Sequence, residues 1–490
     1  MILAFAARLR RPLKILNDDE LQDIHSATLD VLENVGVKFG EENALRILNE
    51  AGADVDPKTS LVKLPSFLVE EAIKRCPRKI KLYGRTDNHD LTLGDGRVYF
   101  TAGANALYIH DLETGQRRTP TSKDCGELTR VCDALEYAHV ILPVVVPQDV
   151  PQDIADRVKC KISYENTEKH YWCDVYGRDS AIDLIRMAAA VAGGMDELRR
   201  RPVITINPGV TSPLMWSKTA TEAILECARH GVPQLPDCMP NAGATSPVTL
   251  AGSVVQQNAE NLSFITLAQS ASPGTPAYGY SSPGITNMRT GSVVYGAVEV
   301  AIQSVAMSQI YSWYGIPYAT TVGLTDSKIH DEQAAYERAT AALLAALGGP
   351  SMISTQFGAV NSLIDASYEQ TMIDDEIAGM ISRALSGVQV NEETMAVDLI
   401  AKVGPGGHYL GQRHTKDLFL KEHYLPRLAD RNSRDKWKKE GAKDIAKRAR
   451  ERAEEILRAH QPAPLEDDVR KELDDIIEEA RRRRLSHLST

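Results

Sequence analysis

One local pattern recurs in the sequence and restricts its fold: an apolar helix-forming segment, then glycine, a β-branched residue and proline, then a strand-forming segment. Residues 219–230 precede Gly231-Val232-Pro233, and residues 297–314 precede Gly315-Ile316-Pro317. Glycine supplies the left-handed residue that ends a helix, and proline prevents the helix from continuing. Helices that alternate with strands in this way predict a parallel sheet covered by helices.

Further strand-forming segments alternate with helix-forming segments throughout residues 98–410. The predicted strands are residues 138–146, 169–176, 203–206, 234–237, 275–279, 318–322 and 352–355. A unit of this length predicts a closed (β/α)8 barrel rather than an open doubly wound sheet. No Gly-x-Gly-x-x-Gly follows a first strand, which argues against a dinucleotide-binding fold.

Composition divides the chain into three parts: a helical subdomain over residues 1–95, the barrel over 96–415 and charged helices over 416–490. In the first part, Asn17 and Asp18 are candidate caps of a helix that Gly36 ends, and two more helices are expected at residues 42–50 and 65–75. Residues 430–490 carry 17 basic and 15 acidic side chains. Interleaved charges of this kind predict solvated or partner-facing helices, and the run at residues 481–484 is interpreted as a solvated helix end.

Overall charge and cysteine usage exclude several classes of protein. The formal net charge is −10, which argues against a nucleic-acid binder. The seven cysteines form no Cys-x-x-Cys pair, so a reducing cytoplasm is expected. No run of 18 apolar residues is present, and the basic residues near the start follow the short apolar run, whereas a secretory signal places them before it. A cytoplasmic protein without a membrane segment is therefore predicted.

The active site of such a barrel is expected in the loops after the strands. Four polar clusters fall there: residues 99–105, 277–284, 323–337 and 404–415. Each also has a structural interpretation, as a chain turn or a helix cap. His408 and His414 lie six residues apart, which is not the spacing of a helical zinc site, and no metal site is predicted.

Aromatic side chains are scarce, at 6%, yet several gather near the predicted strand ends. They are Tyr99, Phe100, Tyr108, Tyr278, Tyr280 and Tyr318. Aromatic faces around one cavity suit an alkylated ammonium ion, which each face attracts by about 0.5–2 kcal/mol. The alternative is that these tyrosines are half-buried packing residues.

Three longer segments resemble the trimethylamine methyltransferase family. They are residues 21–37, the segment 325–337 that begins Thr325-Asp326-Ser327-Lys328, and the segment 404–410 that includes Gly407-His408-Tyr409. The resemblance implies a (β/α)8 barrel that removes a methyl group from an amine. It also implies that the methyl group passes to the cobalt of a corrinoid carried by a separate protein, with no tightly bound cofactor in the chain itself.

The chain departs from the archaeal members of that family, which contain pyrrolysine, because it is written wholly in the twenty standard residues. It therefore resembles the branch that demethylates quaternary amines such as glycine betaine, proline betaine or carnitine. A quaternary ammonium already carries the charge that makes its amine a leaving group. In-line transfer to cobalt then requires orientation and exclusion of water rather than a protein acid.

Loop position and chemistry suggest the residues of the site. Asp326, Glu337 and His408 are the catalytic candidates. The carboxylates of Asp326 and Glu337 are expected to compensate the positive charge of the substrate. The predicted substrate-binding residues are Tyr99, Phe100, Asn105, Tyr278, Tyr280, Gln356, Asn361, Tyr409, Arg413 and His414. His408, Tyr409, Arg413 and His414, with Gln356 and Asn361, are expected to bind a substrate carboxylate.

The expected partners are a corrinoid protein that docks over the barrel mouth and further copies of the chain in a homo-oligomer. Two alternatives stay open. One is a methyltransferase for another donor, such as a tertiary amine or a methoxy compound. The other is a barrel that binds an amine without catalysis.

Overall fold

The computed structural model describes residues 6–9 and 11–488. Its centre is a curled sheet of seven parallel strands in the order β11-β10-β9-β6-β18-β17-β14. The strands are β6 (Tyr99–Ala102), β9 (Val140–Ile141), β10 (His170–Asp174), β11 (Ile204–Asn207), β14 (Gly279–Ser281), β17 (Tyr318–Thr321) and β18 (Met352–Phe357). We call the end where these strands finish the carboxyl end, and the end where they begin the amino end. Within the described part of the chain, no helix is long and apolar enough to cross a membrane.

The segment after Pro233 lies between the two edge strands of this sheet. Gln234 forms parallel bridges with both Ile206 of β11 and Ala277, which precedes β14. The Ile206 amide donates to the Pro233 carbonyl at 3.0 Å, and the Tyr278 amide donates to the Gln234 carbonyl at 3.2 Å. Backbone hydrogen bonds therefore link this short segment to both edges.

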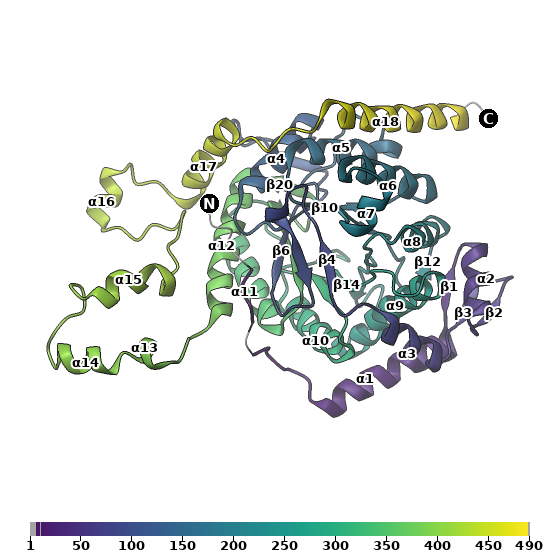
Figure 1. The fold of residues 1–490 in the computed structure, drawn as a ribbon, viewed down its shortest axis with the longest axis horizontal. Coiled ribbons are helices and arrows are strands. Elements are labelled where there is room, and N and C mark those ends of the chain that lie inside the picture. Colours follow the sequence, from purple (N-terminus) through teal and green to yellow (C-terminus); the bar gives the residue numbers. More distant parts are fainter. Residues whose placement is uncertain (1–5, 10, 489–490) are drawn as a thin grey trace.

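Each central segment is followed by a helix, and the helices form an outer layer around the sheet (Figure 1). They are α4 (Ser122–Ala134), α5 (Ala155–Asn166), α6 (Arg178–Ala192), α8 (Lys218–His230), α9 (Leu250–Ala271), α10 (Val298–Tyr314), α11 (Glu332–Gly348) and α12 (Tyr368–Ser386), with α7 (Met195–Arg200) after α6. As the pattern predicts, α8 and α10 end at Gly231 and Gly315, both in the left-handed region with φ of 69°. The alternating α/β prediction is confirmed.

The N-terminal part contains strands that the sequence analysis did not predict. The expected helices are present as α1 (Asp18–Asp30), α2 (Glu42–Glu50) and α3 (Ser66–Arg75), with a capping box at Asn17. However, β1 (Val37–Phe39), β2 (Asp54–Asp56) and β3 (Leu61–Lys63) join β12 (Met215–Trp216) in a four-stranded sheet. This part is therefore mixed rather than helical, because three-residue strands are too short to show alternation and one partner lies far along the chain.

A separate β-hairpin covers the amino end of the central sheet. It consists of β4 (Ile80–Leu82) and β5 (Leu91–Leu93), separated by a 3-10 turn at Asp87–His89. Their apolar side chains pack in one cluster with Tyr99, Trp172, Tyr278 and Tyr280 from the inner face of the sheet. The interior of the curled sheet is thus closed at the amino end by packed side chains.

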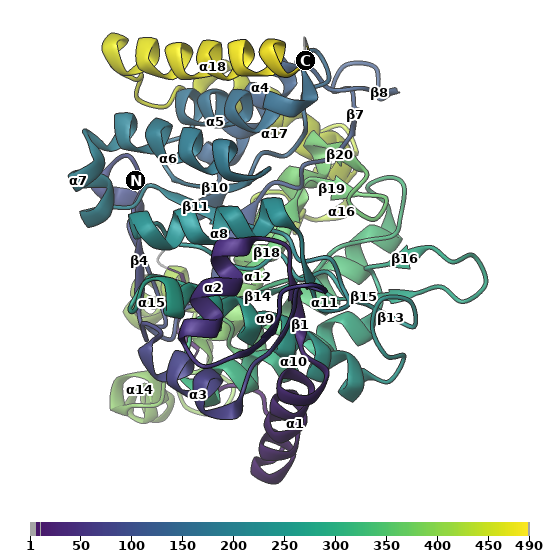
Figure 2. The same ribbon diagram turned by 90° about the vertical axis from the view of Figure 1, so that its right-hand side faces the viewer.

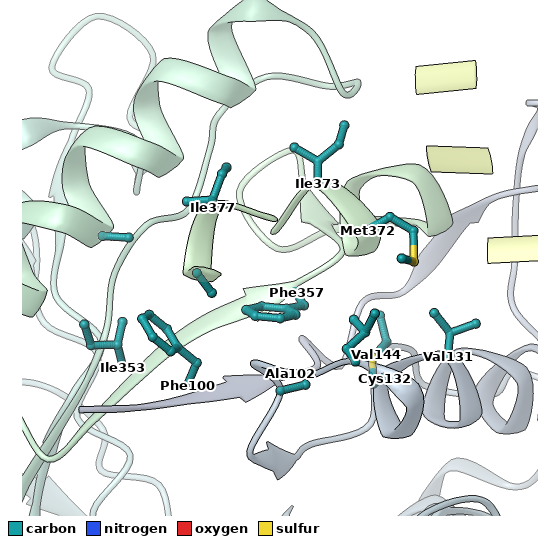
Figure 3. Close-up of a cluster of buried hydrophobic side chains, with 14 of the residues drawn as sticks. Phe100, Ala102, Val131, Cys132, Val144, Ile353, Phe357, Met372, Ile373 and Ile377 are labelled. Atoms are coloured by element: carbon teal, nitrogen blue, oxygen red, sulfur yellow. The ribbon is translucent and has the colours of Figure 1, made fainter. Parts of the chain in front are cut away.

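The opposite face of the strands packs against the helices. Figure 3 shows Phe100 and Ile353 beside Phe357, with Ile373 and Ile377 of α12 above them. Successive strand side chains point to opposite faces, so Phe100 is directed outward while its neighbour Tyr99 is directed inward.

Loops at the carboxyl end form two small sheets. One contains β13 (Asn241–Ala242), β15 (Gly284–Thr286) and β16 (Val293–Val294). The other contains β7 (Tyr108–His110), β8 (Arg117–Arg118), β19 (Ala359–Val360) and β20 (Asp365–Ser367). In Figure 2 these sheets lie to the right and β4 lies to the left, so the two ends of the central sheet are seen side-on.

The C-terminal part begins with a projecting segment, residues 387–427, that we call the arm (Figure 1). It contains α13 (Glu392–Met395), α14 (Val397–Val403) and α15 (Arg413–Glu422), and it is followed by α16 (Arg434–Lys439). The chain then returns to the body as α17 (Ile445–Ala459), which packs on α12, and α18 (Asp467–Leu488), which packs on α6. At the predicted solvated end of α18, Arg481 and Arg482 are exposed, whereas Arg483 contacts Asp183 and Arg484 contacts Asp153 of the body.

Candidate active site

A cavity of about 410 Å³ opens at the carboxyl end of the central sheet. It is lined by residues that end the strands or directly follow them. These are Asn105, Leu142, Trp172, Asp174, Tyr176, Asn207, Gly209, Asp237, Met239, Tyr280, Ser282, Gln356 and Leu363, together with a few residues around Ser217. Residues far apart in the sequence meet here because parallel strands finish at the same edge.

Two aromatic side chains form one wall of the cavity. Trp172 of β10 and Tyr280 of β14 are almost fully buried, and their rings meet edge to face with centroids 5.2 Å apart. The Tyr280 hydroxyl contacts the Thr321 hydroxyl of β17, which orients the ring. Two aromatic rings thus line the cavity, and aromatic rings attract a quaternary ammonium that lies over their faces.

A buried lysine organises the polar side of the cavity. Lys159 of α5 donates to Asn105 Oδ1 at 2.7 Å and lies 3.3 Å from Asp174 Oδ2. Asp174 also accepts from the amide nitrogens of Asn105, at 2.6 Å, and Asn207, at 3.1 Å. Burial alone would lower the pKa of Lys159, but Asp174 and, to a smaller extent, Tyr176, Cys125 and Asp156 together outweigh this effect, so its pKa is raised above the ordinary value. Lys159 is therefore a fixed cation that balances Asp174.

Asp237, at the end of the segment after Pro233, also lines the cavity. Its backbone amide donates to the Pro208 carbonyl at 2.9 Å. Among the described residues, no side chain forms a hydrogen bond or an ion pair with its carboxylate. Burial, and then the charge of Asp174, raise its pKa to about 7.

Several buried polar atoms at the cavity have no hydrogen-bond partner within the described part of the chain. They include Gln356 Oε1, Asn207 Oδ1 and Ser282 Oγ. Gln356 adopts a φ of 46°, which is uncommon for a residue with a side chain. Unpaired buried polar atoms are costly, so those that face a cavity are candidate contacts for a ligand.

A family model for trimethylamine methyltransferase matches residues 3–486, nearly the whole chain. The chain belongs to the trimethylamine methyltransferase family. It is 38% identical to trimethylamine methyltransferase MttB of Desulfitobacterium hafniense, over 94% of this chain and 93% of that protein. It is 33% identical to the glycine betaine methyltransferase of the same species, over 94% and 96% of the two chains.

Trimethylamine methyltransferase MttB of Methanosarcina barkeri is also 33% identical, over 96% of this chain and 95% of that protein. Among solved structures, the monomethylamine methyltransferase of Methanosarcina barkeri superposes with a TM-score of 0.53, covering 92% of this chain and 89% of the other at 12% identity. That likeness concerns the fold. Membership of the trimethylamine methyltransferase family makes the chain a methyltransferase, which confirms the predicted enzyme class.

Three of the predicted substrate-binding residues line the cavity: Asn105, Tyr280 and Gln356. Each lies at or after the end of a central strand, where the sequence analysis expected the site. Asn105 belongs to the lysine network, Tyr280 to the aromatic wall, and Gln356 offers an unpaired oxygen.

Asp326, Glu337 and Asn361 lie outside the cavity lining and instead fasten loops. Asp326 accepts from the backbone amides of Tyr295 and Gly296, both at 3.0 Å. Glu337 accepts from the Thr325 hydroxyl at 2.6 Å and the Asp326 amide at 3.0 Å. Asn361 donates through its side chain to Asp365 at 3.2 Å. The hydrogen bonds of Asp326, Glu337 and Asn361 therefore stabilise loop conformations.

The three predicted aromatics Tyr99, Phe100 and Tyr278 do not line the cavity either. Tyr99 and Tyr278 begin or precede their strands and pack with the β4–β5 hairpin toward the amino end. Phe100 points into the layer between the sheet and the helices. Phe100 is excluded because a one-residue change along a strand reverses the face that a side chain occupies, whereas Tyr99 and Tyr278 share the inner face but lie nearer the amino end.

His408, Tyr409, Arg413 and His414 lie on the arm, away from the cavity. Helices of a βα unit run opposite to the strands, so α12 ends toward the amino end and the arm starts there. In Figure 2, α14 and α15 lie on the side of β4, opposite to β15 and β16. The site therefore contains none of these four side chains.

Trp172, Asp174 and Asp237 line the cavity but were not singled out from the sequence, and neither was Lys159. A usable signal was present, because Asp237 ends a predicted strand and Asp174 lies two residues before the end of another. Lys159 gave no signal, since a lysine on a helix is normally solvated. Within the described residues, no group of three or more His, Cys, Asp or Glu side chains could hold a metal ion.

Proposed function

We propose that the chain transfers a methyl group from a quaternary amine to the reduced corrinoid of a separate protein. The observation that carries this proposal is the cavity itself, where two aromatic side chains line the same space as a carboxylate that has no side-chain partner among the described residues. Trp172 and Tyr280 suit the methylated nitrogen, and Asp237 supplies negative charge. The relative named as a glycine betaine methyltransferase supports a quaternary donor.

The chain's own residues bind and orient the donor in this proposal. The positive nitrogen already makes the departing amine neutral, so no protein acid has to protonate it. Trp172 and Tyr280 hold the methylated nitrogen, and Lys159, through Asn105 and Asp174, keeps the polar wall rigid. The reduced corrinoid supplies the nucleophile that accepts the methyl group. Holding the carbon–nitrogen bond in line with that nucleophile and excluding water are the remaining tasks.

The proposal includes a closed (β/α)8 barrel over residues 96–415, flanked by residues 1–95 and 416–490. The bridges of Gln234 to Ile206 and Ala277 support the closure, since this segment occupies the place of an eighth strand. An in-line transfer benefits from such a frame, because every lining residue is held at the end of a fixed strand.

The corrinoid protein docks over the carboxyl end, where the cavity opens. Exposed apolar side chains follow six of the central segments on the carboxyl-end loops, and Tyr176 and Met239 among them also line the cavity. They are Leu107, Tyr176, Met239, Val248, Met288, Ile329 and Ile364. Met288, on the loop between β15 and β16, is 75% exposed. Apolar patches with polar surroundings are typical of protein interaction sites.

We also propose a homo-oligomer in which the arm packs against another copy. All residues of the arm are described, and none of them is buried. It nevertheless exposes apolar side chains, among them Val388, Val390, Ile400, Leu410 and Leu420. Because the arm starts from the amino end, it leaves the cavity opening free for the corrinoid protein.

The proposed function is tested by incubating the protein with chemically reduced cobalamin and single methyl donors. Glycine betaine, carnitine, proline betaine, choline and tetramethylammonium are compared with trimethylamine, and methylcobalamin is followed by absorbance. We expect transfer from at least one quaternary donor and its loss in Trp172→Leu. Transfer from trimethylamine alone would favour a tertiary donor, and transfer from none of them would contradict the proposal.

A further inference from the structure

The charges around the cavity leave one carboxylate without a counter-ion. Asp174 is balanced by Lys159 and held by the amides of Asn105 and Asn207. Asp237 has no such partner among the described residues. One unbalanced negative charge matches a ligand whose net charge is +1.

The polar atoms at the cavity favour the same ligand. The amide nitrogens of Asn105 and Asn207 each give one of their two N–H donors to Asp174, which leaves fewer donors for a ligand carboxylate. The unpaired Asn207 Oδ1 is an acceptor, and Gln356 Oε1 is another. No Arg, Lys or His is among the described residues that line the cavity.

We propose that the cavity selects a methylated ammonium ion that has no carboxylate of its own, with Asp237 as its counter-charge. This inference rests on the proposed function and narrows its substrate class. Glycine betaine and carnitine are zwitterions, so either would leave the cavity with a net negative charge. Their carboxylates would also enter a site that already holds Asp174 and Asp237. Four side chains that the sequence suggests for carboxylate binding lie on the arm, at the amino end of the central sheet and away from the cavity. They are His408, Tyr409, Arg413 and His414.

Binding should be linked to the ionisation of Asp237. The groups that act on it are Asp174 of β10, balanced by Lys159 of α5, with Tyr280 of β14, Tyr295 and the neighbouring Cys238 nearby. In the free protein the pKa of Asp237 is raised to about 7. A bound cation favours the ionised form and lowers that pKa, so binding releases a proton near neutral pH. Affinity should therefore fall about tenfold as the pH is lowered from 8 to 6.

The experiment is calorimetric titration of the full-length protein, without any corrinoid, at pH 6, 7 and 8. The ligands are tetramethylammonium and choline as chlorides, with glycine betaine as the zwitterionic comparison. We expect both cations to bind at least about tenfold more tightly than glycine betaine at pH 8. Their affinity should weaken toward pH 6, with proton release measured in buffers of different ionisation enthalpy.

Two variants separate the site from a general charge effect. Asp237→Asn should weaken tetramethylammonium binding about tenfold or more at pH 8 and remove its pH dependence. Asp196→Asn removes one charge from a side chain on α7 that is 87% exposed. It should change neither the affinity for tetramethylammonium nor the pH dependence of that affinity. Equal or tighter binding of glycine betaine, binding of no ligand, or an unchanged affinity in Asp237→Asn would overturn the inference.

The outcomes also distinguish this inference from the proposed function. Methyl transfer from glycine betaine, together with its tight binding, would leave the proposed function standing and overturn the carboxylate-free substrate. Selective cation binding with no methyl transfer from any donor would support the carboxylate-free ligand and overturn the proposed function.

Discussion

At the scale of single residues, the cavity depends on side chains whose neighbours hold them in place. Tyr280 is positioned by Thr321 through its hydroxyl and by Trp172 through its ring. The pKa of Asp237 is raised by burial and by Asp174, and no cationic side chain among the described residues offsets these effects. Small changes at these positions should therefore alter substrate binding rather than the fold.

Replacing Tyr280 by leucine should weaken binding of the methyl donor, because one aromatic face is lost. A cation–π contribution of about 0.5–2 kcal/mol corresponds to a KM raised about 2- to 30-fold. Tyr280→Phe is the matched control, since it keeps the face and removes the contact with Thr321; its KM should stay near that of the unmodified protein. If both substitutions raise KM equally, the Tyr280 hydroxyl rather than its aromatic face would account for the weaker binding.

At the scale of secondary-structure elements, a buried ion pair holds two helices to the end of one strand. Arg338 of α11 pairs with Asp374 of α12 at 2.6 Å, and both side chains are almost fully buried. The same guanidinium donates to the carbonyls of Thr355, at 2.7 Å, and Ala359, at 2.6 Å. These two residues bracket Gln356, so the pair positions that side chain at the cavity.

Arg338→Met should lower the free energy of unfolding by about 3–5 kcal/mol, because it leaves the Asp374 carboxylate buried without its partner. Urea denaturation followed by circular dichroism measures the loss. Arg46→Met, which breaks a pair whose side chains are 60% and 61% exposed, should cost no more than about 0.5 kcal/mol. The double variant Arg338→Met, Asp374→Leu should be more stable than Arg338→Met; a double variant that is less stable would contradict this account.

At the scale of the whole molecule, two apolar surfaces lie at opposite ends of the central sheet. One lies on the loops at the carboxyl end and includes Val248 and Met288, and the other is the arm with Leu410 and Leu420. Figure 2 shows β15 and β16, near the first, on the opposite side from α14 and α15. The proposed partners would thus bind without competing for one surface.

Charged substitutions should separate the two surfaces. Leu410→Glu with Leu420→Glu should lower the mass measured by light scattering, because burial of these side chains between copies becomes unfavourable. Val248→Glu with Met288→Glu should leave that mass unchanged and slow methyl transfer to a corrinoid protein. A mass that is unaffected by the arm variants would contradict the proposed homo-oligomer.

Local patterns predicted the alternating helices and strands well. Gly231 and Gly315 end their helices as expected, and the capping box at Asn17 begins α1. The short strands β1, β2 and β3 were missed, because their pairing with Met215–Trp216 is not visible in any local segment. Of the predicted site residues, Asn105, Tyr280 and Gln356 line the cavity, whereas those on the arm and those that hold loops, such as Asp326, do not.

The sequence by itself determined the family and the alternation of helices and strands in the central part of the chain, because both depend on residues close together in the chain. Only the tertiary structure decided which side chains share the cavity. Asp174, Asp237 and Lys159 come from three separate segments, and their charges act on one another only when the parallel strands bring them together. The unbalanced charge of Asp237, from which the substrate inference follows, is a property of that assembly, since electrostatic effects depend on distance and burial in three dimensions.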